Sequence, residues 1–259
     1  MINVSFKSLG SAGRFANQLF QLSALMSYCK KYGFNPQFPT WAYAKYFKYD
    51  FSQHFNDKIT VDGIYNEPTF HYTEIPEFTR STELSGYFQS TKYHTHINIH
   101  ELFELKDEYR AIVDAQYNAI NPNGKFTCSF HVRRGDYTKE PQLSYHGLLG
   151  IEHYDEAIAY IQKNTLHEFI PMVMSDDIEW CKRNFKGPPA YEFIEGNEPI
   201  IDLFLMAKCH VNVIANSSFS LWAGLLNQNS NKKIIAPKSW FWTAGLDTSD
   251  LLDKNWIRL

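Results

Sequence analysis

The second half of the chain alternates between short apolar runs and stretches with apolar residues at helical spacing. Short β-prone runs bounded by turn residues predict strands, and apolar residues at every third or fourth position predict helices. We expect strands over 126–132, 169–174, 191–194, 210–215 and 232–236, and helices over 152–163, 177–185, 199–209 and 217–227. This alternation is typical of a parallel sheet that is covered by helices on both faces.

The beginning of the chain shows the same opening unit. Ile2–Phe6 is short and β-prone, Gly10–Gly13 predicts a tight turn, and apolar residues then recur at helical spacing as far as Gly33. Residues 35–81 carry scattered prolines and aromatics without clean periodicity, which predicts loops and short elements. The chain is therefore expected to have an α/β fold with two Rossmann-like lobes that face a central cleft.

The strongest turn cluster in the middle of the chain is Asn121–Gly124, and the sequence rhythm changes after it. This change places the expected domain boundary there. The prediction is an N-terminal domain over 1–123 and a C-terminal domain over 124–259.

Composition places the chain among ordinary globular proteins. Its 259 residues are 44% hydrophobic and 20% charged, and a net charge of -3 gives no general attraction to nucleic acid or anionic lipid. Any anion site must therefore be local. The 16% aromatic content fits sugar binding and a large core equally well.

Two further features concern the compartment. No apolar stretch approaches the roughly 20 residues that cross a bilayer, and the N-terminus lacks the pattern of a secretory signal, so we expect a cytoplasmic protein. The four widely spaced cysteines predict reduced, buried thiols rather than a zinc site: Cys29, Cys128, Cys181 and Cys209.

Two adjacent arginines, Arg133 and Arg134, follow the predicted strand 126–132. In an open parallel sheet, ligands bind at the carboxyl ends of the strands, and a guanidinium offers a planar fork of donors that matches phosphate oxygens. Adjacent side chains diverge, so at most one of the two arginines should point directly into a site. The alternative is a surface ion pair between Arg134 and Asp136.

The run Asn216-Ser217-Ser218 opens a predicted helix directly after another strand. Exposed N–H groups at a helix N-terminus form a natural cradle for phosphate. Plain N-capping by Asn216 or Ser217 explains the same residues without a ligand.

Asp176 and Asp177 follow the predicted strand 169–174. One of them is expected to cap the next helix, and the other to accept hydrogen bonds from a base or a ribose. The two carboxylates are adjacent rather than spaced as in a DxD motif, so no metal site is predicted.

Amide side chains occupy the first turns of the first predicted helix, at Asn17 and Gln18. An amide both donates and accepts hydrogen bonds, which suits a ligand rich in hydroxyl groups. The stretch 86–90 has two interpretations: it faces a sugar through Tyr87 and Gln89, or it is a packed aromatic strand.

Taken in order, these segments resemble the α-1,2-fucosyltransferases, which use GDP-fucose and have the two-lobed GT-B fold. The resemblance spans the chain and rests on GRFANQLFQ (13–21), GYFQS..KY (86–93), HVRRGDY (131–137), SDD..W (175–180), and DLFLMAKCH leading into ANSSFSLW (202–222). The family often has GGLGNQ where this chain has GRFANQ, a motif that is also similar to the protein O-fucosyltransferases. The resemblance therefore defines the donor more closely than the acceptor.

The resemblance implies that Arg133 binds the donor diphosphate. It also implies that the nucleotide pocket is lined by His131, Ser217, Ser218, Phe219 and Ser220. Negative charge grows on the diphosphate as the bond to sugar C1 breaks, so a preorganised arginine and a helix N-terminus act where that charge develops. They can replace a divalent metal, and no metal or other cofactor is expected.

By the same resemblance, an acceptor hydroxyl attacks from the opposite face and turns the β-linked donor into an α-linked product. The expected acceptor is a glycan, with transfer to O-2 of a terminal galactose. Asp136 is the nearest carboxylate that can serve as general base, and holding an arginine is its alternative role. Asn17 can only orient groups. The N-terminal domain is expected to face fucose or acceptor, and the C-terminal domain to bind GDP.

Three alternatives stay open. The chain transfers another GDP-deoxyhexose or acts on a protein hydroxyl, which donor screening would reveal. A glycan-binding protein without catalytic activity is also compatible with the aromatic content. The third is a GT-A enzyme with a metal at Asp176 and Asp177; their adjacency disfavours it, and sensitivity to a chelator would decide.

Overall fold

The computed structural model describes residues 1–165 and 168–259. The chain divides into two compact units, one comprising Met1–Glu108 with Leu246–Asp253 and the other Tyr109–Gly245 with Lys254–Leu259. The division therefore falls inside helix α3 (Asp107–Ile120), earlier than the turn at 121–124 where the boundary was expected.

The contacts of α3 explain why the boundary lies there. Asp107, in its first turn, pairs with Lys48 of the first unit at 3.1 Å. Further along the helix, Asp114 pairs with Lys208 at 2.6 Å and Tyr117 exchanges a 2.9 Å hydrogen bond with Thr127, both in the second unit. Most of the helix therefore packs with the C-terminal unit, and the turn that follows it is internal to that unit.

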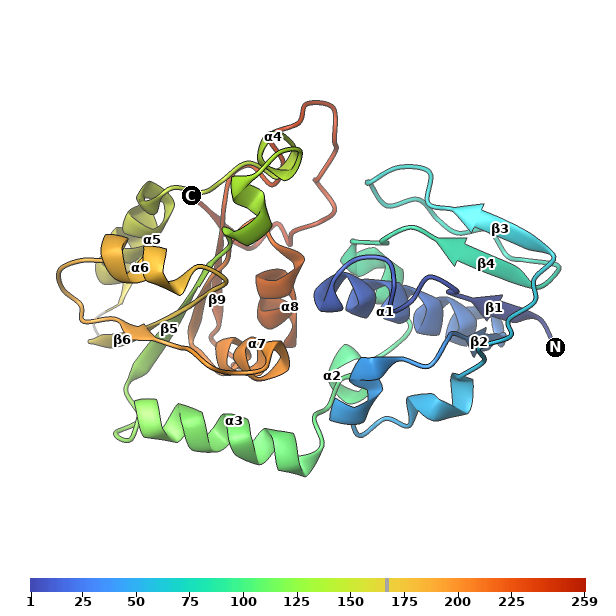
Figure 1. The fold of residues 1–259 in the computed structure, drawn as a ribbon, viewed down its shortest axis with the longest axis horizontal. Helices are drawn as coiled ribbons and strands as arrows, with labels where there is room; N and C mark the ends of the chain where they lie inside the picture. The colour runs from blue at the N-terminus through green and yellow to red at the C-terminus, as the bar shows by residue number, and fades with distance from the viewer. Residues whose placement is uncertain (166–167) are drawn as a thin grey trace. The chain divides into compact units, whose positions relative to one another are not determined.

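A four-stranded parallel sheet organises the first unit, in the order β2-β1-β4-β3 (Figure 1). Its strands are short: β1 (Asn3–Ser5), β2 (Asn35–Gln37), β3 (Gly63–Asn66) and β4 (Thr82–Ser85). Val4 of β1 is in register with Pro36 on one side and Thr82 on the other. The parallel sheet expected from the opening strand–turn–helix unit is thus present.

Helix α1 (Phe15–Tyr32) follows the glycine-containing turn, as the periodicity predicted. Nearly every side chain from Phe15 to Cys29 is buried. Gly33 ends the helix with φ +69°, a left-handed conformation that glycine adopts at little cost, and its N–H donates to the Cys29 carbonyl. Lysines in the last turn complement the negative end of the helix dipole.

Residues 35–81 form loops and short elements, as expected. Short helices here and just beyond are η1 (Ala42–Tyr46), η2 (Phe51–His54), η3 (Thr91–His94) and α2 (Ile99–Leu102). Aromatic side chains pack this region: Trp41 stacks on Phe47 at 5.8 Å between ring centroids and meets Phe51 edge-on at 5.3 Å. Much of the aromatic content therefore serves the core of this unit.

A six-stranded parallel sheet organises the second unit, in the order β10-β9-β8-β5-β6-β7. Its strands are β5 (Phe126–Val132), β6 (Phe169–Ser175), β7 (Glu192–Phe193), β8 (Val211–Val213), β9 (Lys233–Ala236) and β10 (Ile257–Arg258). Its further helices are η4 (Gly135–Thr138), α4 (Gln142–His146), α5 (Ile151–Asn164), α6 (Ile178–Asn184), α7 (Pro199–Ala207) and α8 (Ser218–Leu226). The predicted alternation of strands and helices is confirmed.

The core of this unit lies between the sheet and its helices. Phe130 of β5 and Tyr154 of α5 are fully buried, and the Tyr154 hydroxyl donates to the His131 carbonyl at 3.1 Å. All four cysteines of the chain are free and buried, as predicted, and burial raises the pKa of the Cys181 thiol to about 11. Among the described residues, no helix combines the length and the apolar character needed to span a membrane.

Candidate active site

The strand order of the second unit predicts where a ligand binds. From β5 the chain continues to β6 and β7 on one side, and β8 lies on the other side, so the order switches between β5 and β8. In open parallel sheets, ligands bind outside the carboxyl ends of the strands at such a switch. The arginine run follows β5 and the serine run follows β8, so both motifs flank this point.

Arg133 is held by two carboxylates at the end of β5. Its guanidinium donates to Asp136 and to Asp176, and it lies 4.9 Å from the centre of the Tyr137 ring. The Arg133 side chain is only 11% exposed, whereas Asp136 is 39% and Asp176 is 30% exposed. A side chain at Gly135 would overlap the Asp176 carboxylate, which explains why this motif has glycine at that position.

Arg134 diverges from its neighbour, as expected for adjacent side chains. Its Nε donates to Asp177 at 3.1 Å, and its guanidinium lies 4.1 Å from the centre of the Trp180 ring. The alternative expectation, an ion pair between Arg134 and Asp136, is wrong: Asp136 pairs with Arg133, and Arg134 pairs with Asp177.

The two aspartates after β6 also have separate roles. Asp177 caps α6 by accepting from the Trp180 N–H at 3.2 Å. Asp176 accepts from Arg133 and from the Arg134 N–H at 2.8 Å. The expectation that one aspartate caps the helix is confirmed, and the other is engaged by arginine in the structure.

Charge at this edge is slightly negative rather than positive. Two guanidinium groups face three carboxylates, Asp136, Asp176 and Asp177. A diphosphate must therefore compete for the donors of Arg133. Within the described part of the chain, no three His, Cys, Asp or Glu side chains are arranged to hold a metal.

A buried histidine joins the two strand ends. His131 of β5 shares a 2.9 Å hydrogen bond through Nδ1 with the Ser220 hydroxyl of α8. Burial, together with the positive charge of Arg133, lowers the pKa of His131 to about 3, so the ring is neutral at physiological pH. His131 and Ser220 are both buried and fix α8 against β5.

The start of α8 presents two kinds of residue. Ser217 caps the helix by accepting from the Phe219 N–H at 3.3 Å, while Ser218 and Phe219 are half-buried at the helix start. Asn216 is buried, and its Nδ2 donates to the His146 carbonyl at 2.7 Å and to the Trp240 carbonyl at 3.2 Å. Ser218 and Phe219 are thus more accessible to a ligand than Asn216.

In the first unit, the amide residues form a separate cluster at the carboxyl edge of its sheet. Gln89 donates to the Asn17 Oδ1 at 2.7 Å. Tyr87 is 42% exposed beside this pair. Gln18 is different: it is buried, its Nε2 donates to the Gly13 carbonyl at 3.0 Å, and its Oε1 accepts from Trp41 at 2.9 Å. The Gln18 amide therefore holds the turn before α1 and does not face outward.

A residue that sequence reasoning missed supports this cluster. Glu67, just after β3, accepts from the Tyr87 N–H at 2.7 Å and from the Phe88 N–H at 3.0 Å. Phe88 is buried with φ +53°, an unusual conformation for a bulky residue, which the Glu67 carboxylate helps to hold. Burial raises the pKa of Glu67. The stretch 86–90 is thus a loop with Phe88 inside and Tyr87 outside, rather than a strand.

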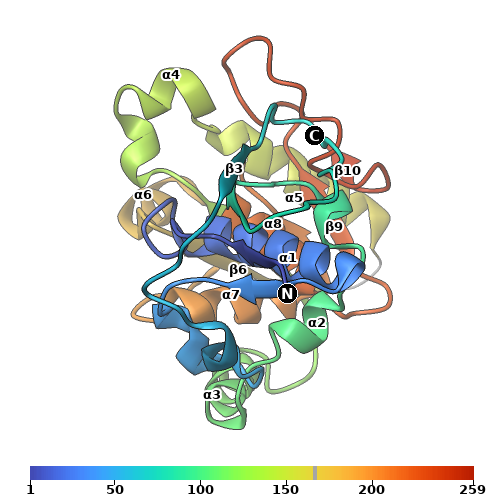
Figure 2. The same ribbon diagram turned by 90° about the vertical axis from the view of Figure 1, so that its right-hand side faces the viewer.

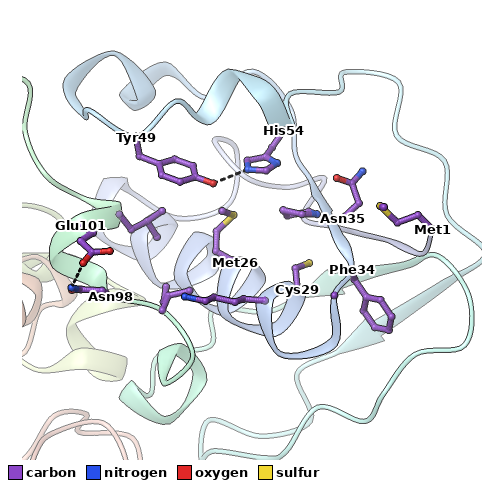
Figure 3. A pocket seen from close by; sticks show the side chains of 14 residues that line it. Met1, Met26, Cys29, Phe34, Asn35, Tyr49, His54, Asn98 and Glu101 are labelled. Atoms are coloured by element: carbon purple, nitrogen blue, oxygen red, sulfur yellow. Dashed lines mark hydrogen bonds between the residues drawn. The ribbon is translucent and has the colours of Figure 1, made fainter.

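A cavity of about 500 Å³ lies elsewhere in the first unit (Figure 3). It is lined by Met26 and Cys29 of α1, by Asn35 at the start of β2, and by Tyr49, whose hydroxyl is 2.9 Å from the His54 ring. It opens near the amino ends of the strands, and none of the predicted site residues lines it.

Comparison with known proteins now identifies the family. The model of glycosyl transferase family 11 matches residues 8–259. The chain belongs to glycosyl transferase family 11. This match confirms the resemblance on which the expected activity rests.

Curated relatives of this family 11 chain carry related names. It is 35% identical to the O-antigen biosynthesis glycosyltransferase WbnK of Escherichia coli, over 68% of this chain and 60% of that protein. It is 32% identical to an Escherichia coli alpha-1,2-colitosyltransferase, over 69% of this chain and 63% of that protein. A galactoside 2-alpha-L-fucosyltransferase of Bos taurus is 28% identical over 60% of this chain and 44% of its own length. The matches thus span less than two thirds of these relatives.

Solved structures share the fold. The fucosyltransferase NodZ from Bradyrhizobium superposes with a TM-score of 0.57 at 14% identity, over 87% of this chain and 92% of that chain. The apo form of POFUT1 gives 0.56 at 11% identity, over 90% and 97%. The α/β fold of GT-B type is confirmed by these likenesses, while the cleft between two lobes stays a prediction.

Proposed function

We propose that this family 11 chain transfers L-fucose from GDP-β-L-fucose to a hydroxyl of a glycan acceptor, with inversion at C1. The observation that carries the proposal is that Arg133 follows β5 and α8 begins after β8, so both lie at the β5–β8 switch point, in a chain whose relatives are named fucosyl- and colitosyltransferases. The chain's own residues would bind the diphosphate at this edge, where charge grows as GDP leaves.

Arg133 and α8 supply two kinds of donor for that charge. The guanidinium is a fixed fork of N–H groups, and the first turn of α8 carries backbone N–H groups that have no partner further back in the helix. His131 stays neutral and keeps α8 registered against β5 through Ser220. The arrangement is preorganised, because buried side chains set the spacing of the two elements.

The acceptor proposed is a terminal β-galactoside that is modified at O-2, which the names of the relatives support. In the first unit, the half-buried Asn17 amide, which is held by the buried Gln89, and the exposed Tyr87 ring suit the hydroxyls and the apolar face of a sugar. We assign this cluster to fucose or acceptor and the second unit to GDP.

Colitose as the donor sugar is a second candidate, favoured by the 32% identity to an alpha-1,2-colitosyltransferase. The two donors share GDP in the proposal and differ in the sugar. Discrimination would therefore lie in the sugar-facing residues and not at Arg133.

The deciding experiment incubates the purified chain with GDP-fucose or GDP-colitose and with methyl β-galactoside or a panel of galactose-ended glycans, followed by linkage analysis of the product. We expect an α-1,2-linked product from one donor with a strong preference over the other. Arg133→Ala serves as the inactive control. Absence of transfer from either donor to any galactose-ended acceptor would refute the proposal.

A further inference from the structure

A segment near the C-terminus packs against the end of helix α4. Figures 1 and 2 both show the red segment that follows β9 beside α4. The Trp242 and Thr243 N–H groups both donate to the Tyr145 carbonyl, at 3.1 and 3.3 Å. Two backbone hydrogen bonds therefore fix this part of the segment to the last turn of α4.

The indole of Trp242 rests on a glycine. A Cβ added at Gly147 would overlap the indole ring, so the ring lies directly against the backbone at that position. Gly147 also has φ +74°, which disfavours any other residue. The ring is thus supported by a position where a side chain is excluded twice over, by space and by backbone conformation.

The indole remains largely open to solvent despite this support. Trp242 is 60% exposed, and Tyr145, on the same helix end, is 39% exposed. Phe241 lies 5.0 Å from the Tyr145 ring and so backs that ring. Burying an aromatic side chain stabilises a fold. Aromatic side chains that are held in place but left exposed are therefore typical of a binding surface.

Stacked rings connect this surface to Arg133. The His146 ring lies 5.4 Å from Phe241 and stacks on Tyr137 at 4.3 Å with an interplanar angle of 7°. The Arg133 guanidinium then lies over the Tyr137 ring. Tyr145 is therefore part of the same aromatic cluster that positions the arginine proposed to bind the diphosphate, and Trp242 is joined to it by the hydrogen bond to the Tyr145 carbonyl.

We propose that Trp242 and Tyr145 form a stacking platform for a hexose ring of the acceptor glycan. The C–H face of a sugar covers an aromatic ring while its hydroxyls stay in water, which fits a surface that is open on one side. A nucleotide base is usually enclosed on both faces and read along its edge, so it fits this open surface less well. The inference rests on the proposed glycan acceptor; it places the acceptor hexose on the second unit beside the GDP site and leaves the Asn17–Gln89 cluster of the first unit to fucose.

The test compares Trp242→Ala and Trp242→Phe with Ile112→Ala, a matched control that truncates another exposed apolar side chain of the second unit, 44% exposed on α3. Stacking of one ring typically changes affinity by about tenfold. We expect Trp242→Ala to raise the KM for methyl β-galactoside by about tenfold, Trp242→Phe to have a smaller effect, and kcat and the Kd for GDP to stay unchanged. Ile112→Ala should match the parent protein.

Binding is also measured without donor, by saturation-transfer NMR of methyl β-galactoside. Unchanged KM and unchanged saturation transfer in Trp242→Ala would overturn the platform, and so would a loss of GDP affinity, which would mark the rings as a base-stacking site. If the parent protein binds the galactoside through Trp242 but transfers nothing to it, the proposed reaction fails while the platform stands. Trp242→Phe keeps the test valid if the alanine variant does not fold.

Discussion

Replacing Arg133 with alanine should separate catalysis from folding. The guanidinium is the group proposed to meet the charge that develops on the departing diphosphate. Removing one preorganised donor of this kind typically lowers kcat by about 10² to 10³. We therefore expect Arg133→Ala to lose at least a hundredfold in turnover while the protein remains folded.

The structure also sets the stability cost of this change. Arg133 holds Asp136 and Asp176, neither of which is fully solvated, and it stacks on Tyr137. Leaving partly buried carboxylates without their partner costs roughly 1–3 kcal/mol, and the lost stacking adds about 0.5–1 kcal/mol. In a chain of this length, each 1 kcal/mol lowers Tm by about 2–4 °C. A drop of several degrees is therefore expected without loss of the fold.

Arg134→Ala is the matched control. It removes a neighbouring guanidinium that has one carboxylate partner, Asp177, and one ring contact, Trp180. Its stability cost should be similar, and its effect on turnover should stay within about threefold. Arg133→Lys keeps a charge but offers no fork for two carboxylates, so it should rescue turnover poorly.

The assay is initial-rate transfer with GDP-fucose, alongside thermal unfolding of each variant. A folded Arg133→Ala protein with most of its activity would refute the assignment. Equal losses of turnover in Arg133→Ala and Arg134→Ala would show that the two arginines affect transfer only through their packing.

Three further outcomes are expected. EDTA should leave the transfer rate almost unchanged, and a strict requirement for magnesium or manganese would show that Asp176 and Asp177 have been misinterpreted. Asn17→Ala should depress turnover far more than it weakens GDP binding by calorimetry; loss of GDP binding there, with Ser217→Ala and Ser218→Ala unaffected, would reverse the roles of the units. Stability should fall in acid, because burial lowers the pKa of His131 to about 3 and of His94 to about 4. Between these values and about 6.5 only the unfolded chain takes up the protons, so at pH 5 each histidine costs about 2 kcal/mol relative to pH 7.5. Urea unfolding at the two pH values measures this, and equal stabilities would contradict it.

The strands and helices of the second unit could be predicted because each one carries its own period. β5 was predicted over the observed residues, and α5 and α8 within a residue or so at each end. Helix α3 was missed although apolar residues recur in it at helical spacing, at Tyr109, Ile112, Val113, Tyr117 and Ile120; only Val113 among them is fully buried. Because this helix was not predicted, the domain boundary was predicted at the turn 121–124 and not within α3.

Partners distant in sequence were not predictable. Nothing local links Arg133 to Asp176, because their contact depends on the β5–β6 register, in which Val132 lies opposite Ser175. Glu67 was missed for the same reason: its partners are backbone N–H groups of the next strand's loop, which no side-chain motif reveals. Gln18 and Asn216 carry the right chemistry for a ligand but are buried and use their amides inside the protein.

The carboxylates around Arg133 link the two roles considered for Asp136. Without a ligand, Asp136 and Asp176 occupy the guanidinium, so a diphosphate binds by exchange and displaces a carboxylate. Asp136 is the more exposed of the two, so we expect Asp136 to be released. Once released, the Asp136 carboxylate can take up a proton. Asp136 is therefore a candidate general base when the donor is bound. Asp136→Asn should then lower kcat by at least tenfold while GDP affinity stays equal or rises. A weaker affinity for GDP with unchanged kcat would show instead that Asp136 only positions the arginine.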